Sequence, residues 1–225
     1  MKRWLVSGSL FPRRSALHWL YPVVATGSLL PAVNDVCAQT VGPGPIGTPV
    51  NVGSGTTTVV GGTTITTPGT SSAVSGGTLI VDPAAGPSPG SVSFSASNFN
   101  AFGIYATGGT ITFRSGATPG ITTSITTTGN AAAALWTQNT GVSATSAGGL
   151  NIHTTGGYGI VGGLPVGSYG VVASHNSSMS LTQATILTEG LGATGAYAFG
   201  SQVTLNNVAI STRGNAYRDG TGTYG

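Results

Sequence analysis

Residues 208–214 read Val-Ala-Ile-Ser-Thr-Arg-Gly, and earlier parts of the chain repeat this pattern. Its central element, Ile-x-Thr-x-Gly, occurs four times, beginning at Ile125, Ile152, Ile186 and Ile210. A weaker copy around Phe94 ends in Asn98 instead of glycine, and both residue types tolerate a left-handed turn. The spacings of 31, 27, 34 and 24 residues are too unequal for a solenoid of fixed repeat length. They favour a parallel β-helix whose turns carry loops of different length.

Alternation within each copy predicts which side chains point inward. Apolar residues fall on one face of the strand and polar residues on the other, as they do in a half-buried strand. Stacked turns would bring equivalent side chains to within about 4.8 Å of one another. The predicted core ladder therefore consists of Phe94, Ile125, Ile152, Ile186 and Ile210. The same register places Glu189 and Arg213 side by side on the outer surface, 24 residues apart in the chain.

The order of segments also recurs from one turn to the next. After each Ile-x-Thr-x-Gly comes a short segment such as Phe102-Gly103-Ile104 or Tyr197-Ala198-Phe199, and then a second alternating strand. Three short strands per turn indicate a triangular coil. The longest interval contains the tight sequence Gly-Gly-Leu-Pro-Val-Gly at 162–167, where we expect a protruding loop. The predicted fold class is all-β, a right-handed single-stranded parallel β-helix preceded by an N-terminal signal segment.

The composition is unusual for a globular domain, because only 5% of the 225 residues are charged and 38 are glycine. The formal charge of +3 comes from the first 38 residues, where four Lys and Arg stand against one acid, Asp35. The rest of the chain has three of each sign, 3 − 3 = 0. A nucleic-acid partner is not expected, since no basic surface remains to neutralise phosphates.

The first 38 residues have the features of an export signal. A basic region up to Arg14 is followed by an apolar run and by Val-Cys-Ala at 36–38, which predicts cleavage between Ala38 and Gln39. The apolar run is interrupted by Pro22 and Pro31, so we interpret it as a signal peptide and expect no membrane span in the mature chain. The mature chain would contain no cysteine, because Cys37 is the only one.

Three further regions follow the signal. Residues 39–56 are rich in proline and glycine and are predicted to be a linker. Residues 57–91 contain short strands bounded by glycines, which predicts hairpins or irregular coils that cap the N-terminal end. Regular coils are expected over 92–225, cut off at the C-terminus.

These features resemble the passenger of a Gram-negative autotransporter of the pertactin-like kind. The resemblance rests on the extended signal, the Gly/Pro-rich segment, the Ser-Gly-Gly-Thr sequence at 75–78 and the Ile-x-Thr-x-Gly coils. It implies an exported surface protein, an adhesin or structural stalk, with an unidentified glycan or protein ligand. It also implies a downstream translocator barrel in a full-length protein. The expected location is the cell surface or extracellular space if such a barrel follows, and otherwise the periplasm.

A β-helical polysaccharide-binding or polysaccharide-degrading protein is the alternative. Degradation would need paired carboxylates or acidic calcium ligands. The mature chain has only Asp82, Glu189 and Asp219, far apart in sequence, and neither His153 nor His175 has an acid nearby in sequence. We therefore predict no catalytic site, no metal site and no cofactor.

Threonine pairs such as Thr126-x-Thr128 suggest a third class, the flat threonine arrays of ice-binding solenoids. The corresponding outward positions change to His153 and Thr155, then to Leu187 and Glu189. Such a changing surface does not form a regular array, so the threonines are interpreted as strand formers.

Overall fold

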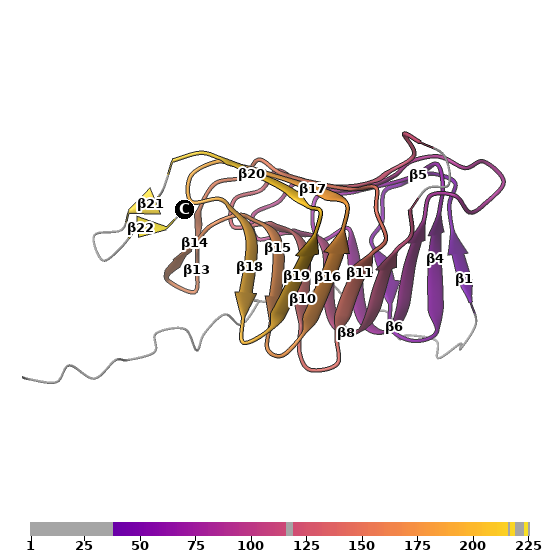
Figure 1. The fold of residues 1–225 in the computed structure, drawn as a ribbon, viewed down its shortest axis with the longest axis horizontal. Coiled ribbons are helices and arrows are strands. Elements are labelled where there is room, and N and C mark those ends of the chain that lie inside the picture. The colour runs from indigo at the N-terminus through magenta and orange to yellow at the C-terminus, as the bar shows by residue number, and fades with distance from the viewer. Residues whose placement is uncertain (1–37, 116–118, 216, 219–222, 225) are drawn as a thin grey trace, which may run out of the picture.

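The computed structural model describes residues 38–115, 119–215, 217–218 and 223–224. This part of the chain is all-β and contains no helix, and it is long in one direction, with its strands side by side along the length (Figure 1). Residues 1–37 of the predicted signal at 1–38 lie outside the described residues, and so does Asp219. Ala38 is exposed, and Gln39 begins the first strand.

The recurring Ile-x-Thr segments form one seven-stranded sheet, here called the isoleucine sheet. Its strands are all parallel, and alternation along the chain gives the five inner strands, β5 to β17, one buried face, whereas every residue of the last strand is exposed. They are β2 (Gly44–Ile46), β5 (Thr63–Thr67), β7 (Val92–Ala96), β9 (Thr123–Thr127), β12 (Leu150–Thr154), β17 (Ala184–Glu189) and β20 (Ala209–Arg213). In register, Phe94 pairs with Ile125, Ile125 with Ile152, Ile152 with Ile186, and Ile186 with Ile210.

The second sheet has eleven strands and contains two parallel ladders. β6 (Ser72–Asp82) and β8 (Phe102–Phe113) are long enough to belong to both. With the first halves of these two strands, the aromatic ladder comprises β3 (Val50–Val52), β10 (Ala133–Gln138), β15 (Tyr169–Ser174) and β18 (Thr194–Phe199). With their second halves, the serine/threonine ladder comprises β1 (Gln39–Val41), β4 (Thr56–Val60), β11 (Ser143–Ser146), β16 (Ser178–Thr182) and β19 (Gln202–Asn206).

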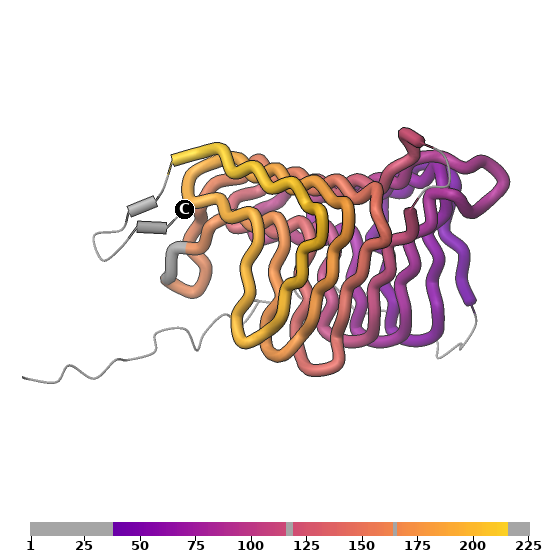
Figure 2. The backbone as a smooth tube through the Cα atoms, in the orientation of Figure 1, coloured from indigo at the N-terminus to yellow at the C-terminus, as the bar shows by residue number. Residues whose placement is uncertain are grey.

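The chain visits the three ladders in a fixed order. From β9 it runs through β10 and β11 to β12, and from β17 through β18 and β19 to β20, each time returning to the isoleucine sheet one strand further along. The tube in Figure 2 therefore advances from indigo at one end to yellow at the other. The predicted all-β class with parallel strands is confirmed, and the path is compatible with a solenoid.

The core lies between the three ladders and runs the length of the stack. Ile125 from the isoleucine sheet, Leu135 from the aromatic ladder and Ile111 from the serine/threonine ladder belong to one continuous buried cluster. Phe94, Ile152 and Ile186 are buried in it as well. Ile210 differs from the expectation, because it is 45% exposed. Its neighbour Ile186 covers one side, and within the described residues no strand pairs with the other edge of β20.

The structure differs from the linker predicted at residues 39–56 and from the hairpin alternative for 57–91. The expected linker contains β1, β2 and β3, which pair in parallel with β4, β5 and β6, and Val50 and Val52 are buried. The strands after residue 57 form no hairpins but continue the same ladders, with Ile46, Ile65 and Phe94 in register. Prolines and glycines flank these very short strands and also make up two of the three residues of β2, so the composition resembled a linker.

The insertion predicted around 162–167 is an antiparallel hairpin of β13 (Gly159–Val161) and β14 (Leu164–Val166). A second antiparallel pair joins β21 (Tyr217–Arg218) to β22 (Thr223–Tyr224). Nowhere in the described part of the chain is there a helix with the length and apolar character needed to cross a membrane.

The glycines of the four repeat copies differ in backbone conformation: Gly190 and Gly214 adopt positive φ angles of 109° and 153°, whereas the two earlier ones do not. Gly129 and Gly156 do not adopt positive φ angles, and neither does Asn98. A Cβ atom on Gly156 would instead overlap the backbone carbonyl of Gly129, and one on Gly129 that of Asn98. Glycine is required at these two positions because successive turns approach each other too closely for a side chain.

Candidate functional site

Aromatic side chains gather on the outer face of the aromatic ladder. In register, Tyr105 of β8, Trp136 of β10, Val172 of β15 and Tyr197 of β18 occupy one row along the stack. Phe102 and Tyr169 lie in a neighbouring row, on either side of Ala133. Phe102, Ala133, Trp136 and Val172 form a buried cluster of their own, separate from the interior core. The face that carries Phe102, Tyr105, Trp136, Tyr169 and Tyr197 is here called the aromatic surface.

The rings hold one another in fixed orientations. Phe102 stacks on Tyr105 with centroids 4.9 Å apart and meets Trp136 edge-on at 5.3 Å. Trp136 donates its indole N–H to Ser174 Oγ at 3.1 Å, and the Tyr105 hydroxyl donates to Gln138 Oε1 at 3.0 Å. Aromatic pairs in such geometries add about 0.5–1.5 kcal/mol beyond their burial. The surface is therefore preorganised.

Burial on this face also changes the acidity of two tyrosines. Loss of water around the hydroxyl raises the pKa of Tyr105 to about 12. The pKa of Tyr169 is also raised. Burial is the largest cause and electrostatic repulsion from Tyr197 the second, while a hydrogen bond with the backbone of Gly167 lowers the pKa. Both hydroxyls are therefore neutral at ordinary pH and can donate hydrogen bonds.

A pocket opens at the β15–β18 end of the aromatic surface. Tyr169, Tyr197 and Phe199 line it together with the more deeply buried Trp136 and Val172. Ser174 and His175 add polar atoms to a lining that is otherwise apolar. Tyr169 and Tyr197 lie 5.6 Å apart with their ring planes inclined by 38°, and His175 meets Phe199 edge-on at 6.1 Å.

A second cluster lies on the outer face of the isoleucine sheet. Glu189 pairs in register with Arg213, and Arg213 Nη1 lies 4.0 Å from Glu189 Oε1. The other carboxylate oxygen, Oε2, is 2.8 Å from Nε2 of His153. His153 therefore has a carboxylate partner that its local sequence did not indicate, because that partner belongs to the next turn. Each of these side chains is at least 36% exposed, so the contacts are surface interactions.

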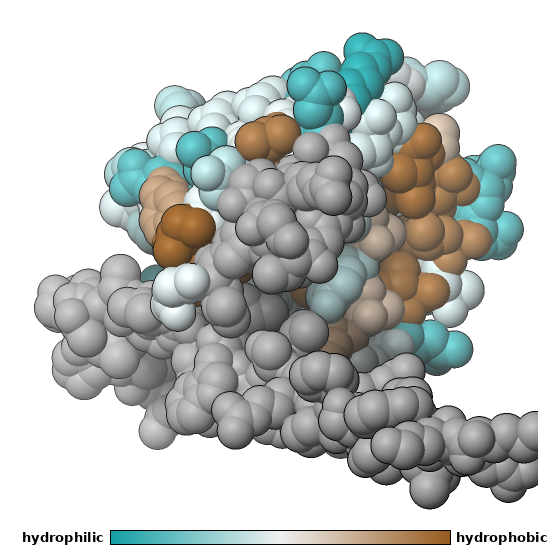
Figure 3. Space-filling view, turned by 90° about the vertical axis from the view of Figure 1, so that its left-hand side faces the viewer, coloured by the Kyte–Doolittle hydropathy of each residue, from teal (hydrophilic) through white to brown (hydrophobic). Residues whose placement is uncertain are grey.

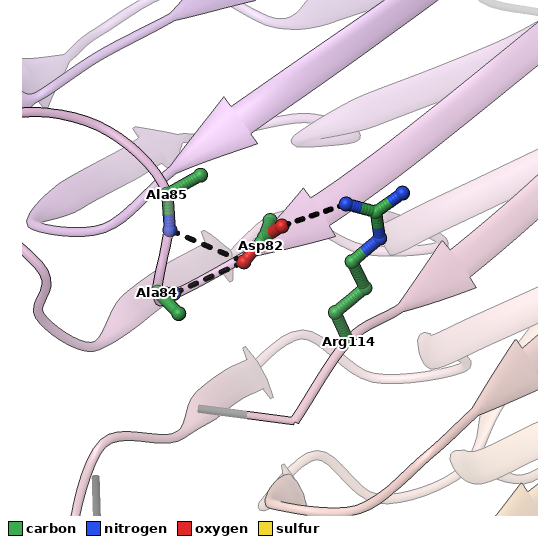
Figure 4. A network of polar contacts seen from close by, with 4 residues as sticks. All are labelled: Asp82, Ala84, Ala85 and Arg114. Atoms are coloured by element: carbon green, nitrogen blue, oxygen red, sulfur yellow. Dashed lines mark hydrogen bonds and ion pairs between the residues drawn. The ribbon is translucent and has the colours of Figure 1, made fainter. Parts of the chain in front are cut away.

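Asp82 has a structural role. It ends β6, and its Oδ2 accepts a hydrogen bond from Arg114 Nη1 at 3.0 Å (Figure 4). Its Oδ1 accepts hydrogen bonds from the backbone N–H groups of Ala84 and Ala85, at 3.1 and 3.2 Å (Figure 4). The carboxylate therefore fixes the turn after β6 and joins it to the next turn of the stack.

The described acids do not come together. Asp82 ends β6, whereas Glu189 lies on the outer face of the isoleucine sheet, and His175 borders the aromatic pocket. Within residues 38–115, 119–215, 217–218 and 223–224, no three His, Cys, Asp or Glu side chains are grouped so that they could hold a metal ion.

Comparison with known proteins gives no match: no protein-family model, no curated protein and no solved structure is significantly similar to the chain.

Sequence reasoning identified the aromatic segments but did not identify the surface they form. Phe102 and Tyr169 do occupy equivalent positions, but Tyr197 lies in the row of Trp136, three residues further along the strand. The signal that could have revealed this surface was the distribution of aromatic residues along the sequence. Phe94 and Phe113 are fully buried in the interior core, whereas Phe102, Tyr105, Trp136, Tyr169 and Tyr197 cluster outside it.

Proposed function

We propose that the protein is the passenger fragment of an exported, autotransporter-like protein, acting as a cell-surface adhesin or structural stalk without catalysis. The observation that carries the proposal is the single long stack of parallel ladders around one continuous core. A stack of this kind extends a surface away from its point of attachment. It also gains stability from backbone hydrogen bonds and stacked side chains without disulfides, as an exported chain lacking cysteine requires.

Within this proposal the stack is a right-handed single-stranded parallel β-helix. The ordered return of the chain to the isoleucine sheet, aromatic ladder and serine/threonine ladder supports a helical path. Right-handed connection is the rule for parallel strands joined by crossovers. Loops of unequal length, including the β13–β14 hairpin, account for the unequal repeat spacing.

The balance of charge supports a neutral ligand over nucleic acid. Arg114 is paired with Asp82, and Arg213 lies beside Glu189, so these described cations are accompanied by acids. Sequence-independent binding to nucleic acid depends on several Lys or Arg residues facing phosphates.

The proposal is tested by export and display. Residues 1–225 are fused to an autotransporter translocator barrel and produced in a Gram-negative host. We expect the passenger to be released from intact cells by added protease, with Gln39 as its first residue. We also expect the displaying cells to adhere to a glycan- or protein-coated surface more than cells displaying the barrel alone. An unprocessed product that external protease cannot reach would contradict the proposal.

The second candidate is a β-helical secreted protein that binds polysaccharide. The aromatic surface favours it, because fixed rings on the outside of a stack offer a binding face that a purely structural stalk does not need. Polysaccharide degradation has no comparable support, since Asp82 and Glu189 lie in different sheets.

A further inference from the structure

The aromatic pocket combines flat apolar groups with a few polar atoms and has no charged lining residue. Tyr169, Tyr197 and Phe199 supply ring surface, and the exposed His175 supplies hydrogen-bonding atoms, whereas the buried Ser174 Oγ already accepts from Trp136 Nε1. The charged residues described above, Asp82 with Arg114 and Glu189 with Arg213, belong to other parts of the stack. A ligand suited to the pocket is therefore neutral, with one flat apolar face and a polar edge.

A neutral sugar ring has these properties. Its axial C–H groups form an apolar face that packs against an aromatic ring, while its hydroxyl groups radiate from the edge toward polar partners. The His175 side chain is exposed, and the Gln138 amide accepts from Tyr105 at the opposite end of the surface. A charged ligand would lose its hydration here without gaining a counter-charge.

The repetition of the surface indicates a polymer as the ligand. The row of Tyr105, Trp136, Val172 and Tyr197 crosses four successive strands, at about 4.8 Å per strand. Gln138, Ser174 and Phe199 form a parallel row beside it. Trp136, Val172 and Ser174 in the middle of these rows are buried. An extended chain of sugar units lying along the stack would therefore contact the partly exposed Tyr105 and Gln138 at one end and Tyr197 and Phe199 at the other, with one unit seated in the pocket.

We propose that the aromatic surface binds a neutral, linear glycan along the β8–β10–β15–β18 rows, with one sugar ring packed against the lining that Tyr169, Tyr197 and Phe199 form. This inference rests on the proposed function and names the ligand class and the site through which the adhesin or stalk makes contact. Preorganisation of the rings by Phe102, Trp136 and Ser174 means that little ordering is required when the ligand binds.

The test is a fluorescence titration of the purified chain in which Trp4 and Trp19 are replaced by phenylalanine, leaving Trp136 as the only tryptophan. The probes are maltohexaose, cellohexaose and the hexamer of N-acetylglucosamine. A heparin hexasaccharide and a neutral phenylalanine-rich peptide serve as comparison ligands. We expect saturable binding of at least one neutral hexasaccharide, in preference to both comparison ligands.

Variants then locate the site. Tyr197→Ala and Phe199→Ala should each weaken binding about 10-fold, because each removes one ring from the lining. Tyr197→Phe keeps the ring and should change the Kd less than about 3-fold. Ser211→Ala, on the outer face of β20, is the matched control and should have no effect. Far-UV circular dichroism checks that each variant is folded.

The proposal is overturned if no neutral hexasaccharide binds, if heparin or the peptide binds more tightly, or if folded Tyr197→Ala binds as well as the parent. Failure here combined with successful export and adhesion in the display experiment would reject the glycan site alone. Glycan binding by a chain that is not exported would reject the proposed function and leave the site in place.

Discussion

Ile186 shows that the effect of a substitution on stability depends on whether the side chain points into the core or toward solvent. Its side chain is fully buried between Ile152 and Ile210, whereas Ser211 on the next strand is exposed. Ile186→Asp would place an unpaired carboxylate in a narrow apolar interior and should cost about 3–5 kcal/mol of unfolding free energy. Ser211→Asp should change it by less than about 0.5 kcal/mol. Urea denaturation of both variants measures the difference, and equal losses would show that the assigned inward and outward directions are wrong.

Gly156 tests the close approach of successive turns. A methyl group at this position meets the carbonyl oxygen of Gly129, which belongs to backbone and cannot rotate away. Gly156→Ala should therefore lower the free energy of unfolding by about 1–3 kcal/mol, as other overpacked sites do. Gly47 is the control, because a Cβ atom there meets nothing within 4 Å. A Gly156→Ala variant as stable as Gly47→Ala would contradict the packing described for this column.

Tyr105 gives the stack a dependence on alkaline pH. Its pKa is raised by burial from 10.0 to about 12 in the folded chain, so folding favours the neutral phenol. This contribution is fully present below pH 10 and is lost as the pH rises from about 10 to about 12. After allowance for the solvent that screens a partly exposed ring, the loss should be about 1 kcal/mol. Denaturation at pH 9 and pH 11 should show a smaller loss for Tyr105→Phe than for the parent, and equal losses would contradict this assignment.

At the scale of elements, Asp82 and Arg114 connect two turns of the stack, and Asp82 contributes more of the stability of this connection than Arg114. Asp82 accepts three hydrogen bonds, from Arg114 and from the backbone of Ala84 and Ala85, and only 13% of its side chain is exposed. Asp82→Ala should cost about 2 kcal/mol, because the Ala84 N–H and Arg114 lose their acceptor, while the Ala85 N–H keeps only the Asp82 backbone carbonyl. Arg114→Ala should cost less than about 1 kcal/mol, since the arginine side chain is 55% exposed. Chemical denaturation of both variants decides the order, and a larger loss for Arg114→Ala would contradict it.

The sequence was most informative where the repeat is strict. Four copies of Ile-x-Thr-x-Gly were sufficient to predict the pairing of Ile152 with Ile186 and of Glu189 with Arg213. A one-residue slip would turn the apolar side outward, and a two-residue slip would no longer align the isoleucines and glycines of the motif. The first strands escaped prediction, since β1, β2 and β3 are three residues long and flanked by proline and glycine. Their strand conformation depends on pairing with β4, β5 and β6, which local sequence does not encode.

The candidate site was harder to predict than the fold. Tyr105, Trp136 and Tyr197 are separated by whole turns whose lengths differ, so their common row becomes apparent only when every loop between them has been placed. The contact of His153 with Glu189 has the same origin, because its partner lies diagonally across to the next strand. Composition indicated that aromatic residues were available, but only the register brings them to one face.

At the scale of the whole molecule, the β20 end of the stack shows how much burial an inward side chain gains from the turn stacked on it. Ile210 is exposed there, and Val203, Leu205 and Val208 are only partly buried although they pack against the core. Viewed from this end, the molecule shows brown hydrophobic groups between teal hydrophilic ones (Figure 3). The same inward positions are fully buried one turn earlier, at Ile186, Met179 and Leu181. Each turn is therefore stabilised by the next, as in repeat proteins generally.

The central claim is that the isoleucine strands form one continuous ladder in which distance follows the number of strands. Pulsed electron paramagnetic resonance tests it with spin labels at the exposed positions Thr64, Thr185 and Ala209, in a chain carrying Cys37→Ser. Thr64 and Thr185 are four strands apart, and Thr64 and Ala209 are five. The predicted backbone separations are about 19 and 24 Å, at roughly 4.8 Å per strand. Distances that fail to increase from the first pair to the second, or that exceed these values by more than about two strand spacings, would contradict the continuous ladder.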